Sequence, residues 1–188
     1  SELYRENIKT KIIAITGSCG KTTLKELLAN SLKQISTVGI SPKSYNNKYG
    51  VPLSLFNLDQ KNNYGVLEIG MDKKGEIDYL SKIVKPDVSV ITNINYAHAK
   101  NFKNIKQIAL AKSEIINNTK INGVVVLNAD DNFYTLHKRI AKKRKLRILS
   151  FSIDNQNANI KLVSIKKITN KFKATIRVNN SKTYFFIS

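Results

Sequence analysis

The segment that most constrains the fold is residues 16–23, TGSCGKTT, a glycine-containing turn between two regular patterns. Residues 11–16 (KIIAIT) form a short apolar run that predicts a buried strand. Residues 22–34 predict a helix, because their leucines recur at helical spacing, at Leu24, Leu27, Leu28 and Leu32. Such a turn directs backbone N–H groups inward, and the helix N-terminus adds positive potential, so a polyphosphate can bind there. The segment therefore predicts a P-loop nucleotide site in an α/β fold.

The candidate nucleotide-binding residues belong to this turn and to the start of the helix: Gly17, Ser18, Cys19, Gly20, Lys21, Thr22 and Thr23. Lys21 is expected to reach the terminal phosphates of ATP, and the Thr22 hydroxyl is expected to ligate Mg²⁺. The widespread form of the motif has its first glycine at position 15, where this chain has Ile15. The turn is therefore a shortened variant that begins at Gly17.

Strand-like and helix-like segments alternate through most of the remaining chain. Strands are expected near residues 36–38 and at 64–69, 87–92, 124–127 and 147–151, and helices at 51–57, 75–84, 105–118 and 132–143. This alternation predicts a mainly parallel sheet with helices on both faces. From residue 158 onward, strand-like runs at 160–165, 171–178 and 183–187 predict a small antiparallel meander at the C-terminal end. With 188 residues, the chain has the size of one domain, residues 1–188.

The formal net charge of +19 raises the question of a nucleic-acid or anionic membrane partner. The alternative is the codon bias of an AT-rich genome, because lysine, asparagine and isoleucine are abundant and tryptophan is absent. Lysines are also spread through most of the chain, and the densest basic run, 138–147, resembles an exposed helix end. We favour the second interpretation and expect no specific nucleic-acid partner. Attraction to phosphate-bearing substrates follows in either case.

Three features concern the compartment. No apolar run approaches the roughly 20 residues that span a bilayer. Residues 1–11 lack the apolar stretch of a secretory signal, and the single cysteine, Cys19, cannot form an internal disulfide. We therefore expect a cytoplasmic monomer with no membrane insertion.

Five further motifs follow the P-loop in order: SYNNKYGVPL (44–53), LEIGMDKKGEI (67–77), TNINYAHAKNF (92–102), IALAKSEI (108–115) and LNADD (127–131). Together with TGSxGKTT they resemble the Mur ligases, the ATP-dependent enzymes that form the amide bonds of peptidoglycan precursors. NNxxGVP combined with ExGMxxxGEI resembles the branch that adds D-alanyl-D-alanine to UDP-N-acetylmuramoyl tripeptide. The resemblance implies that residues 1–188 are the central ATP-binding domain, and that an N-terminal UDP-substrate domain and a C-terminal domain are absent from this chain. It also implies ATP and two Mg²⁺ ions, with catalysis through an acyl phosphate.

Three residues carry the metal chemistry that the resemblance implies. Glu68, at the end of an apolar strand, would complete the shell of the first Mg²⁺ with Thr22. The alternative for Glu68 is a salt bridge to one of the many lysines. His98 would hold the second Mg²⁺, although the family's usual His-Leu-Glu is here His98, Ala99, Lys100. Lys112 matches the lysine of the AKxEI motif, which takes up CO₂ to become a carbamate and so an anionic oxygen ligand. The implied catalytic residues are thus Lys21, His98 and Lys112.

The resemblance also extends to two pairs of polar residues. Asn46 and Asn47 match the asparagine pair before the GVP motif and are expected to fix a loop that faces the nucleotide and the acceptor substrate. Asn128 and Asp130 match a segment that approaches the adenosine, and capping of a helix by Asp130 or Asp131 is an equal alternative.

Three other functions were weighed. Another Mur-type branch, such as the one that adds the third amino acid, shares the ATP chemistry. A generic P-loop kinase or GTPase needs a base-recognition motif such as NKxD, which the sequence lacks. A nucleic-acid module has only the charge in its favour.

Overall fold

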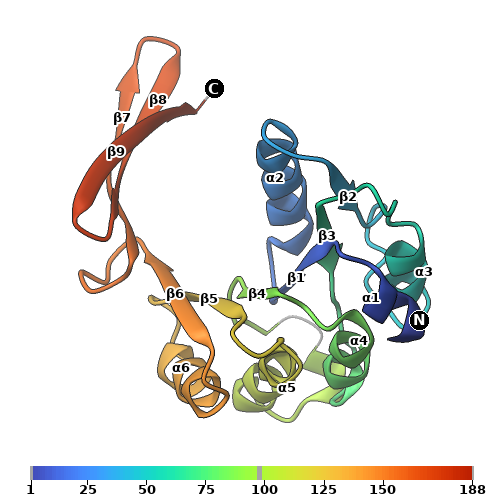
Figure 1. Ribbon diagram of the computed structural model, residues 1–188. Coiled ribbons are helices and arrows are strands. Elements are labelled where there is room, and N and C mark those ends of the chain that lie inside the picture. Colours follow the sequence, from blue (N-terminus) through green and yellow to red (C-terminus); the bar gives the residue numbers. More distant parts are fainter. Residues whose placement is uncertain (1, 97–98, 188) are drawn as a thin grey trace.

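The computed structural model describes residues 2–96 and 99–187 (Figure 1). The helices are α1 (Glu2–Asn7), α2 (Lys21–Lys33), α3 (Gly50–Phe56), α4 (Glu76–Val84), α5 (Ile105–Asn117) and α6 (Tyr134–Lys143), with a 3-10 turn η1 (Ala99–Asn101). The strands are β1 (Lys11–Thr16), β2 (Val38–Ile40), β3 (Tyr64–Glu68), β4 (Val88–Ile91), β5 (Val124–Asn128), β6 (Arg147–Ser152), β7 (Ile160–Ile168), β8 (Lys171–Val178) and β9 (Ser181–Ile187). The predicted alternation is confirmed, with β2 two residues later than expected.

The strands form one sheet in the order β2-β3-β1-β4-β5-β6-β7-β8-β9. Neighbours from β2 to β7 are parallel, and β7, β8 and β9 are antiparallel. The chain builds β2 and β3 on one side of β1 and β4 to β6 on the other, so the strand order reverses at β1. In open α/β sheets, ligands bind at the carboxyl ends of the strands beside such a reversal. The loop after β1 is the P-loop.

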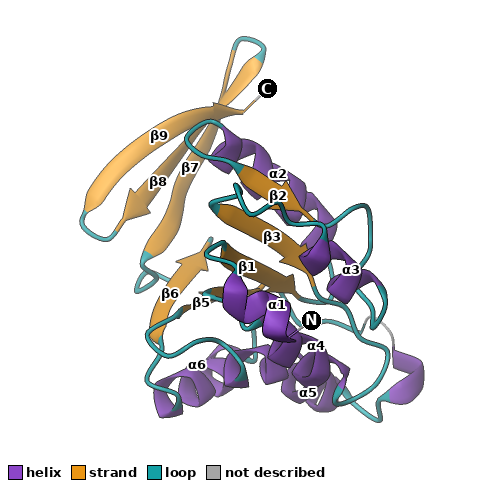
Figure 2. Ribbon diagram, turned by 45° about the vertical axis from the view of Figure 1, so that its right-hand side comes forward, coloured by secondary structure: helices purple, strands orange, loops and turns teal. Residues whose placement is uncertain are grey.

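Helices cover both faces of the parallel part, as predicted. α2 packs on one face of β1, β2 and β3, while α3, α4, α5 and α6 line the other face and α1 rests on α4 (Figures 1 and 2). Successive residues of β1 point to alternate faces, so Ile13 and Ile15 pack toward α2, and Ile12 and Ala14 pack toward α4 and α5. Both faces of β1 are therefore buried, which explains its nearly continuous apolar sequence.

The side of α2 that faces the protein carries three of the four leucines that predicted the helix. Leu24, Leu28 and Leu32 pack on the sheet, but Leu27 is 62% exposed. The fully buried positions of α2 are Ala29 and Lys25, a lysine with no exposed surface. Leucine spacing identified the helix correctly but missed a buried cation.

The strands β7, β8 and β9 form an arm that extends away from the helical body (Figure 1). β7 continues the parallel sheet through two pairs with β6, Phe151 with Ile160 and Ser152 with Lys161. Every described residue of β9 is exposed. The predicted antiparallel meander is confirmed, and β7 is longer than expected.

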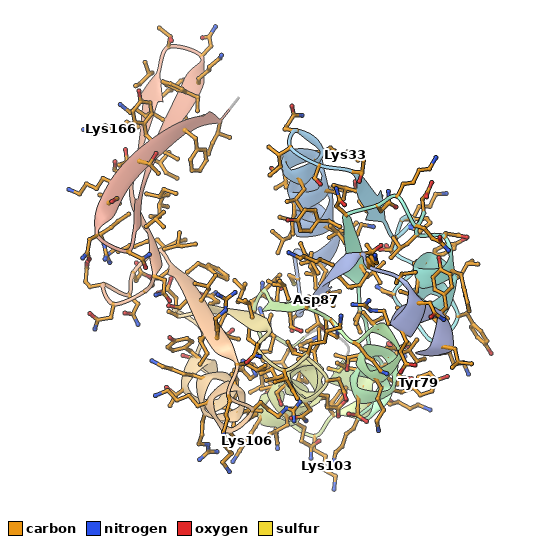
Figure 3. All side chains as sticks on the ribbon, in the orientation of Figure 1. Lys33, Tyr79, Asp87, Lys103, Lys106 and Lys166 are labelled. Carbon is orange, nitrogen blue, oxygen red and sulfur yellow. The ribbon has the colours of Figure 1, made fainter. Side chains whose placement is uncertain are left out.

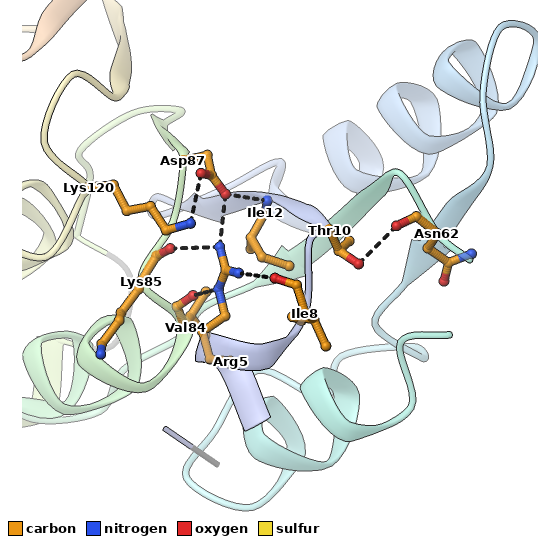
Figure 4. Close-up of polar contacts among 9 residues, drawn as sticks. All are labelled: Arg5, Ile8, Thr10, Ile12, Asn62, Val84, Lys85, Asp87 and Lys120. Atoms are coloured by element: carbon orange, nitrogen blue, oxygen red, sulfur yellow. Dashed lines mark hydrogen bonds and ion pairs between the residues drawn. The ribbon is translucent and has the colours of Figure 1, made fainter. Parts of the chain in front are cut away.

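One buried arginine helps to attach the N-terminal helix α1, which the sequence did not predict (Figure 4). Arg5 Nε donates to the carbonyl oxygen of Val84 (2.7 Å), and Nη2 donates to that of Lys85 (3.1 Å), so the guanidinium covers the carboxyl end of α4. Nη2 also contacts Asp87 Oδ2 at 2.9 Å. Asp87 in turn accepts from the amide of Ile12 in β1 (2.8 Å). Arg5 and Asp87 thus join α1, α4 and the first strand.

The lysines are distributed over the whole molecule. Figure 3 labels Lys33 at the end of α2, Lys103 just before α5, Lys106 in the first turn of α5, and Lys166 on the arm, all at the periphery. All four are exposed. This spread agrees with a general enrichment in lysine rather than with one basic binding face. No helix among residues 2–96 and 99–187 is long and apolar enough to cross a membrane.

Candidate active site

The P-loop leaves β1 at Thr16 and enters α2 at Lys21. Gly17 has φ +147°, and a Cβ built on it would lie 1.8 Å from the Thr92 hydroxyl, so only glycine fits. Gly20, the residue before α2, has φ +78° in the left-handed region. Among the described residues, no side chain caps the N-terminus of α2. The first amides of the helix therefore remain available for an anion.

The segment after β4 holds the P-loop in shape. The Ser18 amide donates to the Asn93 carbonyl (2.9 Å), and the Cys19 amide donates to Asn93 Oδ1 (3.0 Å). The hydroxyl of Thr92 donates to the Cys19 carbonyl at 2.7 Å, and that of Ser18 to the Asn95 carbonyl at 2.9 Å. Sequence reasoning quoted the TNIN motif but gave these residues no role. Their shared pattern, polar residues directly after a buried strand, was the available signal.

Glu68 lies at the end of β3 with 2% exposure, between α2 and the loop that precedes α3. Its Oε2 accepts a hydrogen bond from the Thr22 hydroxyl at 2.7 Å, and its Oε1 accepts one from Asn46 Nδ2 at 2.7 Å. Among the described residues no lysine pairs with Glu68, so the salt-bridge alternative is not what the structure contains. A carboxylate beside a threonine hydroxyl at a P-loop is a set of hard oxygen donors that suits Mg²⁺.

Two lysines converge on one backbone oxygen. Lys21 Nζ donates to the carbonyl oxygen of Gly17 at 3.1 Å, and Lys112 Nζ, from α5, donates to the same oxygen at 2.9 Å. Lys112 is 1% exposed. Burial, and then the charge of Lys21, lower the pKa of Lys112 to about 7. A substantial share of Lys112 is therefore the neutral amine near neutral pH.

A cavity of about 600 Å³ adjoins these groups. It is lined by both lysines and the asparagine loop on one side, and by the start of α4 on the other, with Met71 and Tyr79 among its apolar residues. Four predicted site residues meet there: Lys21, Asn46, Asn47 and Lys112. Asn46 holds Glu68, whereas Asn47 Oδ1 accepts from the amides of Tyr49 (3.1 Å) and Gly50 (3.0 Å) and so begins α3.

Glu114, two residues after Lys112, has a position that the sequence did not reveal. Its carboxylate accepts from the amides of Gly75 (3.0 Å to Oε1) and Asp78 (3.0 Å), so a side chain of α5 caps the N-terminus of α4. Partial burial is the main reason that the pKa of Glu114 is raised, against the lowering effect of these hydrogen bonds. This contact fixes one wall of the cavity relative to Lys112.

Asn128 and Asp130 lie at the same sheet edge, at the end of β5, but they are not lining residues of the cavity. The Asp130 carboxylate binds the turn after β6, where it accepts from the Ser152 hydroxyl (2.5 Å) and from the amide of Ile153 (2.6 Å). Desolvation acts to raise the pKa of Asp130, but its hydrogen bonds outweigh this and lower it. Asn128 Oδ1 accepts from the Asp130 amide at 3.0 Å.

Of the two aspartates considered for helix capping, Asp131 is the one beside the helix. Its Oδ1 accepts from the amide of Phe133, directly before α6, at 2.8 Å. Its Oδ2 accepts from the Ile94 amide at 2.7 Å and so links α6 to the segment that holds the P-loop. Asp130 does not cap α6, because it is turned toward the loop after β6.

His98, the predicted ligand of a second Mg²⁺, lies outside the described residues. Within residues 2–96 and 99–187 there is no cluster of three or more histidine, cysteine, aspartate or glutamate side chains that could hold a metal ion. A metal at Glu68 and Thr22 would therefore depend on the phosphates of a nucleotide for much of its coordination.

Comparison with known proteins decides the family. A model of the Mur ligase middle domain matches residues 15–187. The chain belongs to the Mur ligase family. This confirms the family that the ordered motifs predicted.

The similar proteins belong to the predicted branch. The chain is 38% identical, over 183 residues, to the UDP-N-acetylmuramoyl-tripeptide--D-alanyl-D-alanine ligase of Buchnera aphidicola subsp. Acyrthosiphon pisum, covering 96% of this chain and 37% of that protein. The Escherichia coli enzyme of the same name is 30% identical, over 86% of this chain and 35% of its own length. The chain thus spans little more than a third of these relatives.

Solved structures agree. MurF from Acinetobacter baumannii superposes with a TM-score of 0.89 at 34% identity, covering 98% of this chain and 40% of that one. MurF from Thermotoga maritima, solved in complex with ADP, gives 0.86 at 32% identity, covering 99% of this chain and 43% of that one. The mixed α/β fold is therefore that of the MurF central region.

Proposed function

We propose that this chain is the ATP-using central domain of a ligase that joins D-alanyl-D-alanine to UDP-N-acetylmuramoyl tripeptide. The observation that carries the proposal is the convergence of Lys21, Thr22, Glu68 and Lys112 around a P-loop whose turn begins at Gly17. The similarity to enzymes named for this reaction supports the choice of substrates. We further propose that it acts in the cytoplasm, where both ATP and UDP-linked precursors are available.

The reaction has two steps. An oxygen of the tripeptide's terminal carboxylate attacks the γ-phosphorus of ATP, the bond between that phosphorus and the β–γ bridging oxygen breaks, and ADP leaves. The amine of D-alanyl-D-alanine then attacks the carbonyl carbon of the acyl phosphate. A C–N bond forms, the C–O bond to phosphate breaks, and the amine loses a proton. Because the γ-phosphate and the carboxylate are both anions, positive charge between them is the main requirement of the first step.

The residues of the chain meet this requirement in distinct ways. The Lys21 ammonium, already held above the P-loop by the Gly17 carbonyl, would move little to reach a γ-phosphate. The amides at the start of α2 would bind the phosphate oxygens. Thr22 and Glu68 would hold one Mg²⁺, which offsets charge on the β- and γ-phosphates when bound. The two asparagines would shape the substrate side of the cavity, and Asn128 and Asp130 would approach the adenosine.

Lys112 suits the role of a carbamylated lysine, which we propose as part of a second metal site together with His98. The side chain is buried, faces the P-loop, and has a pKa lowered to about 7. A neutral amine can attack CO₂, forming an N–C bond and releasing a proton, which gives a carbamate with anionic oxygens. The carbamate would also reverse the charge of a cation that Lys21 now repels.

Substitution of the P-loop lysine tests the nucleotide site. In the 188-residue chain, Lys21→Ala should reduce the affinity for a non-hydrolysable Mg·ATP analogue by roughly a hundredfold, since charge-assisted contacts with the terminal phosphates are lost. Lys33→Ala, on the exposed end of the same helix, is the matched control and should leave affinity unchanged. Isothermal titration calorimetry measures both. Equal affinities for wild type and Lys21→Ala would contradict the assignment of the P-loop.

A further inference from the structure

Lys25, one turn after Lys21 on α2, has no exposed surface although it carries a long cationic side chain. Its Nζ donates to the carbonyl oxygen of Ser41 at 2.8 Å and also to that of Lys43. The Glu26 carboxylate lies 3.5 Å from the same nitrogen. The ammonium therefore has two hydrogen-bond acceptors, both in the loop between β2 and α3, and one ion-pair partner.

This loop carries Asn46, one of the two residues that hold Glu68. The loop is tied to β3 by the Ser41 amide, which donates to the Val66 carbonyl (3.0 Å), and by the Gly70 amide, which donates to the Asn46 carbonyl (2.7 Å). Within the described part of the chain, every hydrogen bond between α2 and residues 41–45 comes from Lys25. Lys25 is thus the direct polar connection between the helix that presents Thr22 and the loop that presents Asn46, which otherwise meet through Glu68.

The backbone of the loop indicates that it is held in place. Lys43 has φ +41°, in the left-handed region that side chains other than glycine seldom adopt. Such a conformation costs free energy and persists where surrounding contacts fix it. The hydrogen bond from Lys25 to the Lys43 carbonyl is a contact of this kind.

A buried ammonium fills this space at a higher free energy than an apolar side chain would. Removing an ammonium ion from water costs several kcal/mol before its hydrogen bonds offset it, and an apolar side chain of similar volume packs without that cost. The charge therefore contributes something other than burial. It supplies directional hydrogen bonds, since a group with several donors can donate to the carbonyl oxygens of Ser41 and Lys43 at the same time.

We propose that Lys25 is a positioning residue for the metal site: it fixes the loop before α3 so that Asn46 and Thr22 hold the two oxygens of Glu68 in the orientation that Mg²⁺ requires. Lys25 would touch neither nucleotide nor substrate. It acts through Asn46, whose Nδ2 lies 2.7 Å from Glu68 Oε1, while Thr22 Oγ1 lies 2.7 Å from Oε2. The inference rests on the proposed function for the role of Glu68, but not for the contacts of Lys25.

The test separates metal-dependent from metal-independent binding. Lys25→Met keeps the length of the side chain and removes its donors. We expect its affinity for ADP in the presence of Mg²⁺ to fall roughly tenfold, the low end for residues that orient a metal ligand, with affinity for ADP in EDTA unchanged. Amide hydrogen exchange at Gly70, which donates to Asn46, should become faster. Lys25→Arg, which keeps the cation, should recover part of the Mg²⁺ dependence, and Lys33→Met is the control for loss of a lysine from α2.

A double-mutant cycle tests whether Lys25 acts on Glu68 through Asn46. In an Asn46→Ala background, Lys25→Met should cause no further loss of Mg²⁺-dependent affinity, because the connection is already cut. Additive losses, equal losses with and without Mg²⁺, or no loss would each overturn the proposal. If Lys25→Met does not fold, Lys25→Gln is measured in the same way and the same outcomes apply.

An error in the proposed function would give a different experimental result from an error in the role of Lys25. If the wild-type chain binds ADP neither with nor without Mg²⁺, the nucleotide site itself is wrong. Exchange at the Gly70 amide still decides the role of Lys25 in that case. Faster exchange in Lys25→Met supports the positioning of the loop, and unchanged exchange overturns it.

Discussion

At the scale of single residues, the site has an excess of positive charge around one backbone oxygen. Lys21 and Lys112 both donate to the Gly17 carbonyl, and Lys112 is almost completely buried. Two ammonium groups so close repel each other, which lowers the pKa of the buried one to about 7 after the larger effect of burial. The arrangement becomes favourable once anionic oxygens, from phosphate or from a carbamate, enter the site.

The first prediction concerns carbamate formation on Lys112. With ¹³C-bicarbonate, the chain should give a carbamate carbonyl resonance in its ¹³C NMR spectrum that is absent from Lys112→Ala. Only the neutral amine reacts, so the signal should grow as pH rises through about 7 and decline below it, because the folded pKa of Lys112 is lowered to about 7. An exposed lysine, with its ordinary pKa near 10.4, reacts little at that pH. The same resonance in Lys112→Ala, or none in the wild type at pH 8, would contradict the prediction.

The second prediction uses Cys19, the single cysteine of the chain, which is exposed at the centre of the P-loop. A phosphate bound by this loop would cover the thiol. Mg·ADP at ten times its dissociation constant should slow alkylation of Cys19 by N-ethylmaleimide roughly tenfold, as expected when only the free protein reacts. The rate is followed by intact-protein mass spectrometry. Adenosine at the same concentration is the control, and equal protection by adenosine would argue against a phosphate site at Cys19.

At the scale of elements, the sequence predicted the parallel sheet, its helices and the C-terminal meander, because each depends on local periodicity. It also named Thr22, Glu68 and Asn46 as site residues, Thr22 from the P-loop motif and Glu68 and Asn46 from the resemblance to the Mur ligases. It did not predict the contacts that cross between elements. Lys25 resembled any surface lysine, and Thr92, Asn93 and Asn95, which follow β4 and shape the P-loop, had no assigned role. Such roles depend on which loops meet in space, and one-dimensional spacing does not contain that information.

The attachment of helix α1 also depends on contacts between elements that local spacing does not reveal, and it can be tested. Arg5 is 3% exposed and binds the last carbonyls of α4 as well as Asp87, whose other oxygen accepts from Lys120 at 3.0 Å. Arg5→Ala removes the guanidinium donor from the carbonyl oxygens of Val84 and Lys85 and takes one cation away from Asp87, which keeps the Ile12 amide and Lys120, and it should lower the free energy of unfolding by about 2 to 4 kcal/mol. Lys120→Ala removes the more exposed partner of the same carboxylate and should cost less than about 1 kcal/mol. Urea denaturation followed by circular dichroism measures both variants, and similar effects for the two would refute a special role for Arg5.

At the scale of the whole molecule, the fold brings the carboxyl ends of β1, β3 and β4 together where the strand order reverses, and the residues that we propose for phosphate and metal binding come from the loops at that edge. Under the proposed function, this edge would form one side of a ligase site. The cavity beside Lys21 and Lys112 is lined by Tyr49 and Tyr79, which are 74% and 56% exposed. Water therefore reaches the region where an acyl phosphate would form.

The last prediction follows from that exposure. As a polypeptide of 188 residues, the chain should bind Mg·ADP but should form no amide bond when given ATP, Mg²⁺, UDP-N-acetylmuramoyl tripeptide and D-alanyl-D-alanine. An acyl phosphate survives only where water is excluded, and the amine must be held within about 3.5 Å of the carbonyl carbon for efficient attack. In the relatives named for this reaction, the matched region is only 35% to 37% of the chain, so nearly two thirds of each enzyme lies outside it.

Mass spectrometry of the reaction mixture detects the pentapeptide product, with the full-length Escherichia coli enzyme as positive control. Chemical shift changes at Gly17 and Thr22 on addition of Mg·ADP verify that the phosphate site is intact in the same sample. Sustained product formation by the 188 residues would mean that this edge of the sheet both shields the acyl phosphate and binds the amine by itself. The prediction that these residues alone form no amide bond would then be wrong.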